Sequence, residues 1–349
     1  MTTVELIRER LSEIRPAGLQ RDIVAGGLVR DVGLRNGVVV VQLMPGPLPP
    51  PILDATVADI KQAVGALPEV VRVEVELARP AEQSLAAIPG VADVVAVAST
   101  KGGVGKSTVA VNLAGALTRL GKRVGILDAD IYGPSLPTML GLAGRPRVVE
   151  QTRVMPLEKY GLRVMSMGFF LDDTSPVIWR GPLVTGLLRQ FLKDVEWGEL
   201  DVLVVDLPPG TGDVPLTLAQ QVPLSGGVVV TTPQAVSVID VERGIAMLQQ
   251  VNAPVLGLVE NMSDYVCPQC GTHDALFGAG GAARLEQQFG VPVLARIPLE
   301  PAVRQSGDAG MPIVLAQPEH PVSRTYVRLA EQVLEGVAAE RSAAPRIIG

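Results

Sequence analysis

Apolar residues beyond position 90 gather in short, valine-rich runs separated by stretches with helical periodicity. Continuous apolar runs of this length are typical of strands buried on both faces of a parallel sheet. The runs lie near residues 91–99, 122–128, 162–167, 201–206, 226–232, 253–260 and 291–297. Their alternation with helical stretches predicts an α/β fold with a mostly parallel, doubly wound sheet covered by helices on both faces.

The first 80 residues show a different pattern. Valine and leucine alternate with charged residues over 71–77, which predicts a half-exposed strand. We also expect an amphipathic helix at 4–14, a strand at 38–44 and a second helix at 52–67. These elements predict a small α+β domain over residues 1–79.

Length and charge limit the classes of protein. The 349 residues suffice for two domains, which we place at 1–79 and 91–349, joined by a linker over 80–90 that contains two prolines. The net charge of −6, without a visible basic cluster, argues against a nucleic-acid partner. Charges near the N-terminus and the lack of a long apolar run argue against a secretory signal or a membrane span, so we expect a cytoplasmic protein.

A phosphate-binding pattern comes directly after the first apolar run of the larger domain. It comprises Lys101, Gly102, Gly103, Val104, Gly105, Lys106, Ser107 and Thr108. Glycines let backbone N–H groups close around phosphate oxygens, a lysine supplies positive charge, and a hydroxyl can bind magnesium. The strict pattern would place glycine where Thr100 stands, so this is a variant that begins with the additional Lys101. Helical periodicity begins directly after the loop, which aims a helix N-terminus at the same anion.

Carboxylates stand at the ends of two other expected strands. Asp128 and Asp130 end one strand, and Asp206 ends another. Ligands of open α/β sheets bind at the carboxyl ends of strands, so these residues should share a rim with the glycine loop. We expect Asp206 to hold magnesium together with Ser107, Asp128 to support it, and Asp130 to orient the attacking water. The alternative is that these carboxylates cap helices or turns.

The chain has only two cysteines, Cys267 and Cys270, in one C-x-x-C pattern. Two thiolates per chain are too few for a tetrahedral zinc or a common iron–sulfur cluster, but two symmetric copies supply four. His273 allows an alternative in which Cys267, Cys270 and His273 bind zinc with one external ligand. A redox pair and a pair of unligated thiols are further alternatives.

Several segments together resemble a known family. The lysine-first loop is similar to that of the deviant P-loop ATPases, which include ParA, MinD, the nitrogenase iron protein and the Mrp/ApbC-type iron–sulfur carriers. The segments that resemble the Mrp/ApbC branch are 128–135, Trp179-Arg180-Gly181-Pro182, 206–213, 260–263 and Cys267-Pro268-Gln269-Cys270. Residues 27–32 resemble a MIP18-type (DUF59) domain, although a proline-rich stretch over 45–51 stands where its relatives usually carry a cysteine.

This resemblance implies a function. It implies a slow ATPase that binds ATP and Mg²⁺, forms a homodimer, and holds a bridging iron–sulfur cluster, 4Fe-4S in type, for transfer to apo-proteins, with assembly scaffolds as further partners. It also implies that Lys101 reaches the partner's nucleotide and that Asn261 contacts the adenine edge. The alternatives are a ParA/MinD-type positioning ATPase, an electron donor like the nitrogenase iron protein, and a zinc-stabilised P-loop ATPase.

Overall fold

The computed structural model separates into two compact units, residues 1–84 and 85–349, which are described individually. The structure describes residues 3–16, 22–25, 28–35, 37–43, 50–68, 70–77, 87–131, 133–149, 153–170, 181–234, 237–267, 269–278 and 280–343. Trp179, Arg180, Pro268 and most of the expected linker lie outside these ranges.

The described part of the smaller unit is a three-stranded sheet with two helices. Its elements are α1 (Val4–Leu11), β1 (Val29–Arg35), β2 (Val38–Leu43), α2 (Pro50–Gly65) and β3 (Arg72–Leu77). The strands lie in the order β1-β2-β3, with β1 antiparallel and β3 parallel to the central β2. Val39 and Val41 of β2 are fully buried against Ile7 of α1 and Ile60 of α2 in one small core. Strand β1 was not expected from the sequence.

The larger unit is built on a nine-stranded sheet, which confirms the expected fold class. The strands are β4 (Val91–Ala98), β5 (Val124–Asp128), β8 (Leu157–Lys159), β9 (Leu162–Ser166), β10 (Leu200–Asp206), β11 (Gly226–Thr231), β12 (Val255–Val266), β13 (His273–Asp274) and β14 (Val293–Leu299). Their order is β13-β12-β11-β4-β10-β5-β9-β8, with β14 also paired to β12. Only β8 and β13 pair antiparallel, so the seven expected strands form the parallel part of the sheet.

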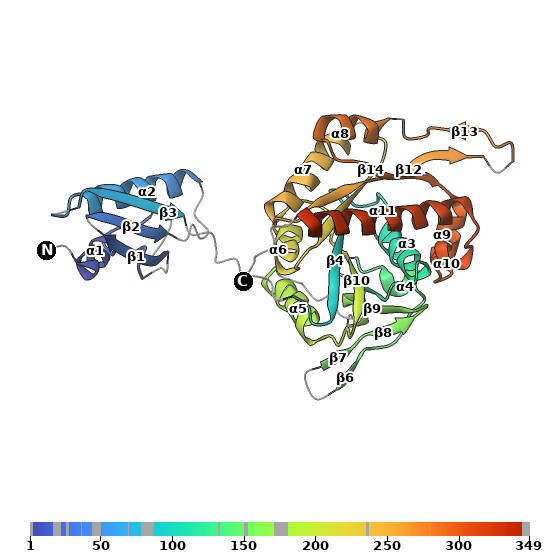
Figure 1. The fold of residues 1–349 in the computed structure, drawn as a ribbon, viewed down its shortest axis with the longest axis horizontal. Helices are drawn as coiled ribbons and strands as arrows, with labels where there is room; N and C mark the ends of the chain where they lie inside the picture. Colours follow the sequence, from blue (N-terminus) through green and yellow to red (C-terminus); the bar gives the residue numbers. More distant parts are fainter. Residues whose placement is uncertain are drawn as a thin grey trace. The chain divides into compact units, whose positions relative to one another are not determined.

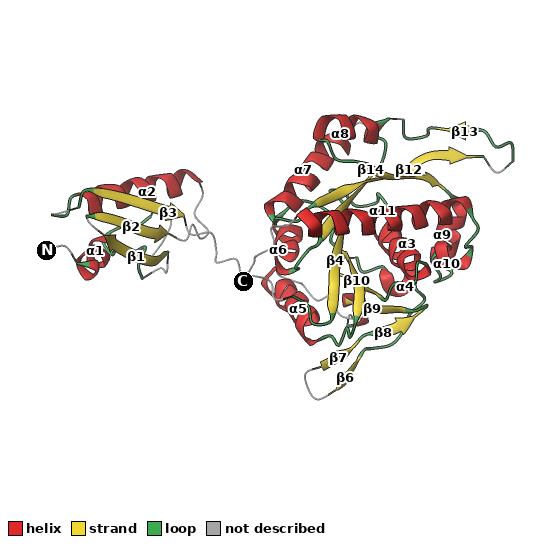
Figure 2. Cartoon of the chain, in the orientation of Figure 1, coloured by secondary structure: helices red, strands yellow, loops and turns green. Residues whose placement is uncertain are grey.

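Helices cover both faces of this sheet (Figure 1, Figure 2). The helices α3 and α11 pack together on one face, with α10 against both, while α5, α6, α7 and α8 lie on the other. The bounds are α3 (Lys106–Arg119), α4 (Leu136–Met139), α5 (Gly181–Asp194), α6 (Asp213–Gln221), α7 (Ser237–Gln250), α8 (Gly281–Phe289), α9 (Pro301–Asp308), α10 (Ile313–Ala316) and α11 (Pro321–Ala343), with a 3-10 turn η1 (Met167–Phe169). A separate hairpin joins β6 (Arg147–Val149) and β7 (Arg153–Met155). Within the described residues, no helix combines the length and apolar content needed to cross a bilayer.

The central strands place polar residues at one edge of the sheet. All five residues of β5 are buried, as are the last five of β10, because helices cover both faces. The parallel register sets Asp206 of β10 beside Asp128 of β5, and Asp128 beside Ser166 of β9. The phosphate loop comes after β4, which pairs with β10, so the loop and these three side chains meet at the carboxyl ends of neighbouring strands.

Candidate nucleotide and cysteine sites

The phosphate loop joins β4 to α3, as the sequence predicts. Gly103 and Gly105 have φ angles of 82° and 83°, a region that favours glycine because it has no Cβ. A Cβ placed on Gly105 would lie 2.2 Å from Nδ2 of Asn261, so this position requires glycine for a second reason. Among the described residues, none accepts a hydrogen bond from the backbone N–H groups of residues 102–105. These donors lie at the N-terminus of a 14-residue helix, which is a favourable arrangement for an anion.

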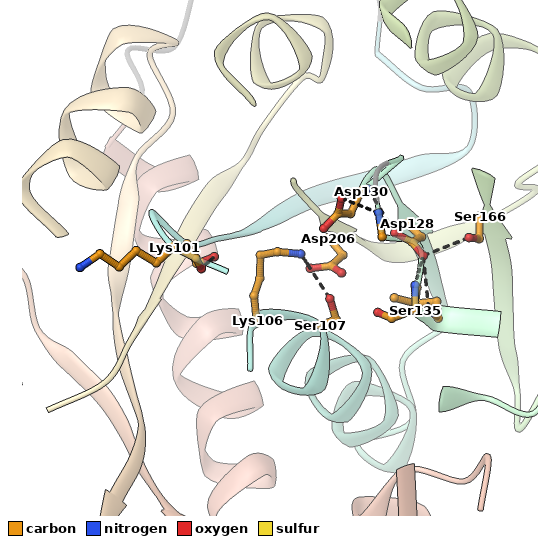
Figure 3. Close-up of polar contacts among 11 residues, drawn as sticks. Lys101, Lys106, Ser107, Asp128, Asp130, Ser135, Ser166 and Asp206 are labelled. Atoms are coloured by element: carbon orange, nitrogen blue, oxygen red, sulfur yellow. Dashed lines mark hydrogen bonds and ion pairs between the residues drawn. The ribbon is translucent and has the colours of Figure 1, made fainter. Parts of the chain in front are cut away.

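Lys106, the first residue of α3, forms a buried ion pair. Its Nζ lies 2.5 Å from Oδ1 of Asp206 and 3.3 Å from Oγ of Ser107 (Figure 3). The Lys106 and Asp206 side chains are only 5% and 0% exposed. Burial raises the pKa of Asp206, and the neighbouring Lys106 ammonium opposes that shift. The other carboxylate oxygen, Oδ2, is buried without a hydrogen-bond partner among the described residues, so it can accept a ligand.

Asp128 is fully buried and surrounded by donors. Its Oδ1 accepts a hydrogen bond from the Asp130 N–H at 3.1 Å. Its Oδ2 accepts hydrogen bonds from the Ser166 hydroxyl at 3.0 Å and from the N–H groups of Ser135 and Leu136 at 3.1 and 3.2 Å. Burial, with a smaller contribution from Asp206, raises the pKa of Asp128 to about 7. Asp128 therefore orders the start of α4 and the backbone of Asp130.

Asp130 lies directly after β5 at the same rim. Its side chain is almost completely buried, and Oδ1 accepts the N–H of Gly133 at 3.3 Å. Figure 3 shows Asp130 on the Asp206 side of the cluster, with Ser166 on the far side. The structure therefore brings together Lys106, Ser107, Asp128, Asp130 and Asp206, whose roles were predicted from the sequence.

Lys101 points in another direction. Its side chain is exposed and directed away from Lys106 and the three carboxylates (Figure 3). The Lys101 carbonyl oxygen accepts a hydrogen bond from Oγ of Ser99 at 2.9 Å, which fixes the backbone where the loop begins. Within one chain, the Lys106 side chain thus points toward the carboxylates and the Lys101 side chain points away from them.

Asn261 is buried beside the loop. Its Nδ2 donates to the carbonyl oxygen of Val104 at 2.8 Å, so strand β12 is tied to the phosphate loop. Thr108 lies in the first turn of α3, where its carbonyl oxygen accepts Nδ2 of Asn112 at 2.9 Å.

The two cysteines lie in the turn between β12 and β13, on a hairpin that extends away from the body of the sheet (Figure 1). The Cys267 N–H donates to Thr272 at 2.9 Å, and the Cys267 carbonyl accepts the N–H of Gly271 at 2.8 Å. Cys270 is exposed and Cys267 is half-buried. The Thr272 hydroxyl, 3.2 Å from Sγ of Cys270, lowers the pKa of that thiol, and Cys267 adds to the shift. The turn thus exposes Cys270 to solvent, leaves Cys267 partly accessible, and favours the thiolate at Cys270.

The zinc alternative is not favoured. Nδ1 of His273 lies 2.8 Å from Oδ2 of Asp264. The other carboxylate oxygen of Asp264, Oδ1, accepts a hydrogen bond from the Ser263 hydroxyl at 2.7 Å. Across the described ranges, no three His, Cys, Asp or Glu side chains converge on a point where a metal ion could bind. His273 pairs across the hairpin with Asp264 and does not join the two cysteines, because its place in β13 is set by pairing with Val266.

The sequence did not point to Ser166 as a member of the site, or to Glu260 as a buried charge next to Asn261. Ser166 ends an apolar run and lies beside Asp128 in the sheet. The sequence signal that could have identified it is a polar residue at the carboxyl end of a buried strand. Glu260 is only 3% exposed, and its Oε1 accepts the N–H of Ala282 at the start of α8 at 3.0 Å. A charged residue inside a valine-rich run was the corresponding signal for Glu260.

Comparisons with known proteins identify the family. The family described as NUBPL iron-transfer P-loop NTPase matches residues 90–334, and the one described as iron-sulfur cluster assembly protein matches residues 5–77. An iron-sulfur cluster carrier protein of Synechocystis is 44% identical over 343 residues, which cover 95% of this chain and 97% of that protein. A protein of the same name from Pseudomonas fragi is 50% identical over 264 residues, covering 74% and 92% of the two chains.

Solved structures give the same fold. A nucleotide-binding protein from Archaeoglobus fulgidus, in complex with ADP, is 42% identical with a TM-score of 0.58, covering 63% of this chain and 87% of its own. The cell division ATPase MinD of Pyrococcus furiosus is 25% identical with a TM-score of 0.53, covering 70% and 98%. The family match over residues 90–334 and the relatives named as carriers point to the same family. This chain therefore belongs to the NUBPL-type iron-transfer P-loop NTPases, in the Mrp/ApbC branch that its motifs resemble.

Proposed function

We propose that this protein is an ATPase that carries an iron–sulfur cluster and transfers it to apo-proteins. The observation that carries the proposal is the C-x-x-C turn at the end of β12, the strand that also contacts the phosphate loop through Asn261. Two solvent-facing thiols suit a cargo that must be received and released. The carrier names of relatives that span nearly the whole chain support the same activity.

At the nucleotide site, we assign phosphate binding to the backbone of residues 102–108 and to the Lys106 ammonium. The donor set fits magnesium, because Asp206 keeps a buried carboxylate oxygen without a partner in the described part of the chain. The Ser107 hydroxyl lies 3.3 Å from the Lys106 ammonium that pairs with this carboxylate. Ser107 and Asp206 would hold the ion, and Asp128, next to Asp206, would support this magnesium site. Bound magnesium would neutralise charge on the phosphates. Asp130 orients the attacking water, and Asn261 contacts the adenine edge.

We further propose a homodimer with a shared cluster. Each chain offers two thiolates, whereas a 4Fe-4S cluster has four protein ligands, so a two-fold axis that brings two cysteine turns together completes the set. The outward direction of Lys101 fits a role in the partner's nucleotide site. The partners are apo iron–sulfur proteins and assembly scaffolds, with the smaller domain as a protein-contact surface. We place the protein in the cytoplasm, acting without nucleic acid or membrane.

Anaerobic reconstitution with iron and sulfide tests the assignment. We expect iron–sulfur absorbance and about four irons per dimer, because a 4Fe-4S cluster needs four protein ligands and each of the two chains supplies two cysteines. Cys267→Ser and Cys270→Ser should each abolish this absorbance. Tight zinc at one ion per chain, with no iron–sulfur absorbance in the wild type, would overturn the carrier assignment.

ATP hydrolysis by the same preparations tests the second half of the proposal. The wild type should release phosphate from ATP in the presence of magnesium at a slow, steady rate. Asp130→Asn is the matched variant, because it removes the expected water-orienting charge and keeps a side chain of the same shape. Equal rates for the two proteins would remove Asp130 from the catalytic residues.

A further inference from the structure

One strand, β12, reaches both candidate sites. Its residue Asn261 is hydrogen-bonded to the phosphate loop at Val104, and Cys267 comes directly after its last residue, Val266. Six positions separate Asn261 from Cys267. At the rise of an extended strand, this is a span of roughly 20 Å. A displacement at Asn261 can therefore reach the cysteine turn along a single backbone.

The strand is interrupted directly after Asn261. Met262 has a φ angle of 55°, a left-handed conformation that costs an L residue with a side chain about 1 kcal/mol or more. The pairing with β14 slips at the same place. Asn261 lies opposite Ile297 and Tyr265 opposite Leu299, so four steps along β12 match two steps along β14. A bulge of this kind bends a strand and changes the direction of the residues beyond it.

The bulge lies against the phosphate loop. A Cβ built on Gly105 would be 2.2 Å from Nδ2 of Asn261 and 3.9 Å from Cε of Met262. Asn261 therefore lies against the loop residue that precedes Lys106, and the end of the Met262 side chain lies near the same position. A change in the loop backbone must move Asn261 or break its hydrogen bond to Val104.

The two halves of β12 are held very differently. Before the bend, the buried carboxylate of Glu260 accepts the Ala282 N–H at 3.0 Å and lies 3.4 Å from Nε of Arg296. After the bend, residues 262–266 are only partly buried, and in the described part of the chain they pair with β13 at two positions and with β14 at one, Tyr265. Because the part of β12 before the bend is anchored, a change in the phosphate loop can move the hairpin beyond the bend.

We propose that Met262 is a positioning residue that couples the phosphate loop to the direction of the β12–β13 hairpin. The inference deepens the proposed function, in which Cys267 and Cys270 hold the cluster. Nucleotide at the loop then changes how the two thiols are presented. By linkage, a ligand bound by the thiols changes nucleotide affinity by the same factor by which nucleotide changes the affinity for that ligand.

Thiol reactivity in cluster-free protein tests the coupling. The rates of alkylation of Cys267 and Cys270 by iodoacetamide are measured by mass spectrometry, with and without saturating Mg·ADP or a non-hydrolysable ATP analogue. Coupling between sites is typically five-fold or more, so we expect at least one wild-type rate to change by about that factor. Met262→Gly, which removes the cost of the left-handed backbone, should reduce the nucleotide effect to less than about two-fold.

Two variants serve as controls. Met262→Leu keeps a side chain at the left-handed position and should retain the nucleotide effect. Asn252→Gly relieves another non-glycine residue at positive φ, 56°, in the turn after α7, and should leave the effect unchanged. Nucleotide affinity should be retained in all three variants, because none of them removes a phosphate or magnesium ligand.

Three results would overturn the inference. These are unchanged thiol rates in the wild type on adding nucleotide, a full nucleotide effect in Met262→Gly, and an equal loss in Asn252→Gly. Because the thiol assay uses cluster-free protein, it is independent of the iron stoichiometry that tests the proposed function. Nucleotide-dependent thiols without any iron–sulfur absorbance would keep the coupling and reject the carrier.

Discussion

The nucleotide rim and the cysteine turn are opposite kinds of site within one sheet. At the rim, the side chains of Lys106, Asp128 and Asp206 are at most 5% exposed and already paired or surrounded by donors. At the turn, Cys270 is exposed, Cys267 is half-buried, and the supporting strand β13 has two residues. A site that must stabilise charge benefits from being built in advance, whereas a site that must exchange its cargo benefits from being open and incomplete. Substitutions at either site can break this contrast.

Lys106→Ala should have the largest effect. Hydrolysis should be abolished, because in the proposed site Lys106 supplies the positive charge at the phosphates. The variant also leaves Asp206 buried without its partner, which should cost about 3–5 kcal/mol of unfolding free energy. Denaturant unfolding measures this cost. Adding Asp206→Asn should restore stability but not hydrolysis, and near-normal turnover in Lys106→Ala would reject the assignment.

Lys101→Ala should lower hydrolysis without a comparable loss of stability, because its side chain is exposed. If Lys101 acts on the partner's nucleotide, equal mixing with Asp130→Ala subunits gives one working site in each mixed dimer. Half of the dimers are mixed, so activity should recover to about one quarter of the wild-type value. Mixtures no more active than either parent would place Lys101 outside the partner's site.

The pH dependence of stability should reveal the buried carboxylate Asp128. Its pKa of about 7 lies above the unfolded value of 3.8, so the folded protein takes up a proton that the unfolded chain does not. Stability should therefore rise as pH falls from 8 through 7, by up to about 1.4 kcal/mol per pH unit, and level off near pH 4. Urea unfolding at a series of pH values measures the slope. Asp128→Asn should remove this slope. An unchanged slope in that variant would show that another group takes up the proton on folding.

Cys267→Ser should have the smallest effect on stability and ATP hydrolysis. The turn buries little, so the unfolding free energy should change by less than about 0.5 kcal/mol, although we expect cluster binding to be lost. Thermal unfolding and phosphate release by the cluster-free variant test this. A loss of several kcal/mol would show that the turn is part of the folded core, and the contrast between the two sites would fail.

The sequence predicted the parallel strands and the phosphate loop because their signals are local. Strands buried on both faces form continuous apolar runs, and the loop needs glycine at fixed positions such as 103 and 105. Strand β1 and the hairpin of β6 and β7 were missed. The hairpin strands have three residues each, too few to establish a period.

Side-chain pairing was the harder part of the site to predict. Asp128 was placed correctly at the rim, but its bonds to Ser135 and Ser166 depend on the neighbouring strand β9 and on the start of α4. His273 was a candidate zinc ligand by its spacing from the cysteines. Its partner, Asp264, is determined by the register of the hairpin, which the spacing does not encode.

The ion pair between Lys106 and Asp206 has a consequence for how ligands enter. Each side chain neutralises the other, so a ligand that takes only one of them leaves its partner as an uncompensated charge in a buried place. A phosphate chain would satisfy the lysine, and a divalent cation would satisfy the carboxylate. We therefore expect the two to bind cooperatively, with the metal complex of a nucleotide preferred over free phosphate or the free ion.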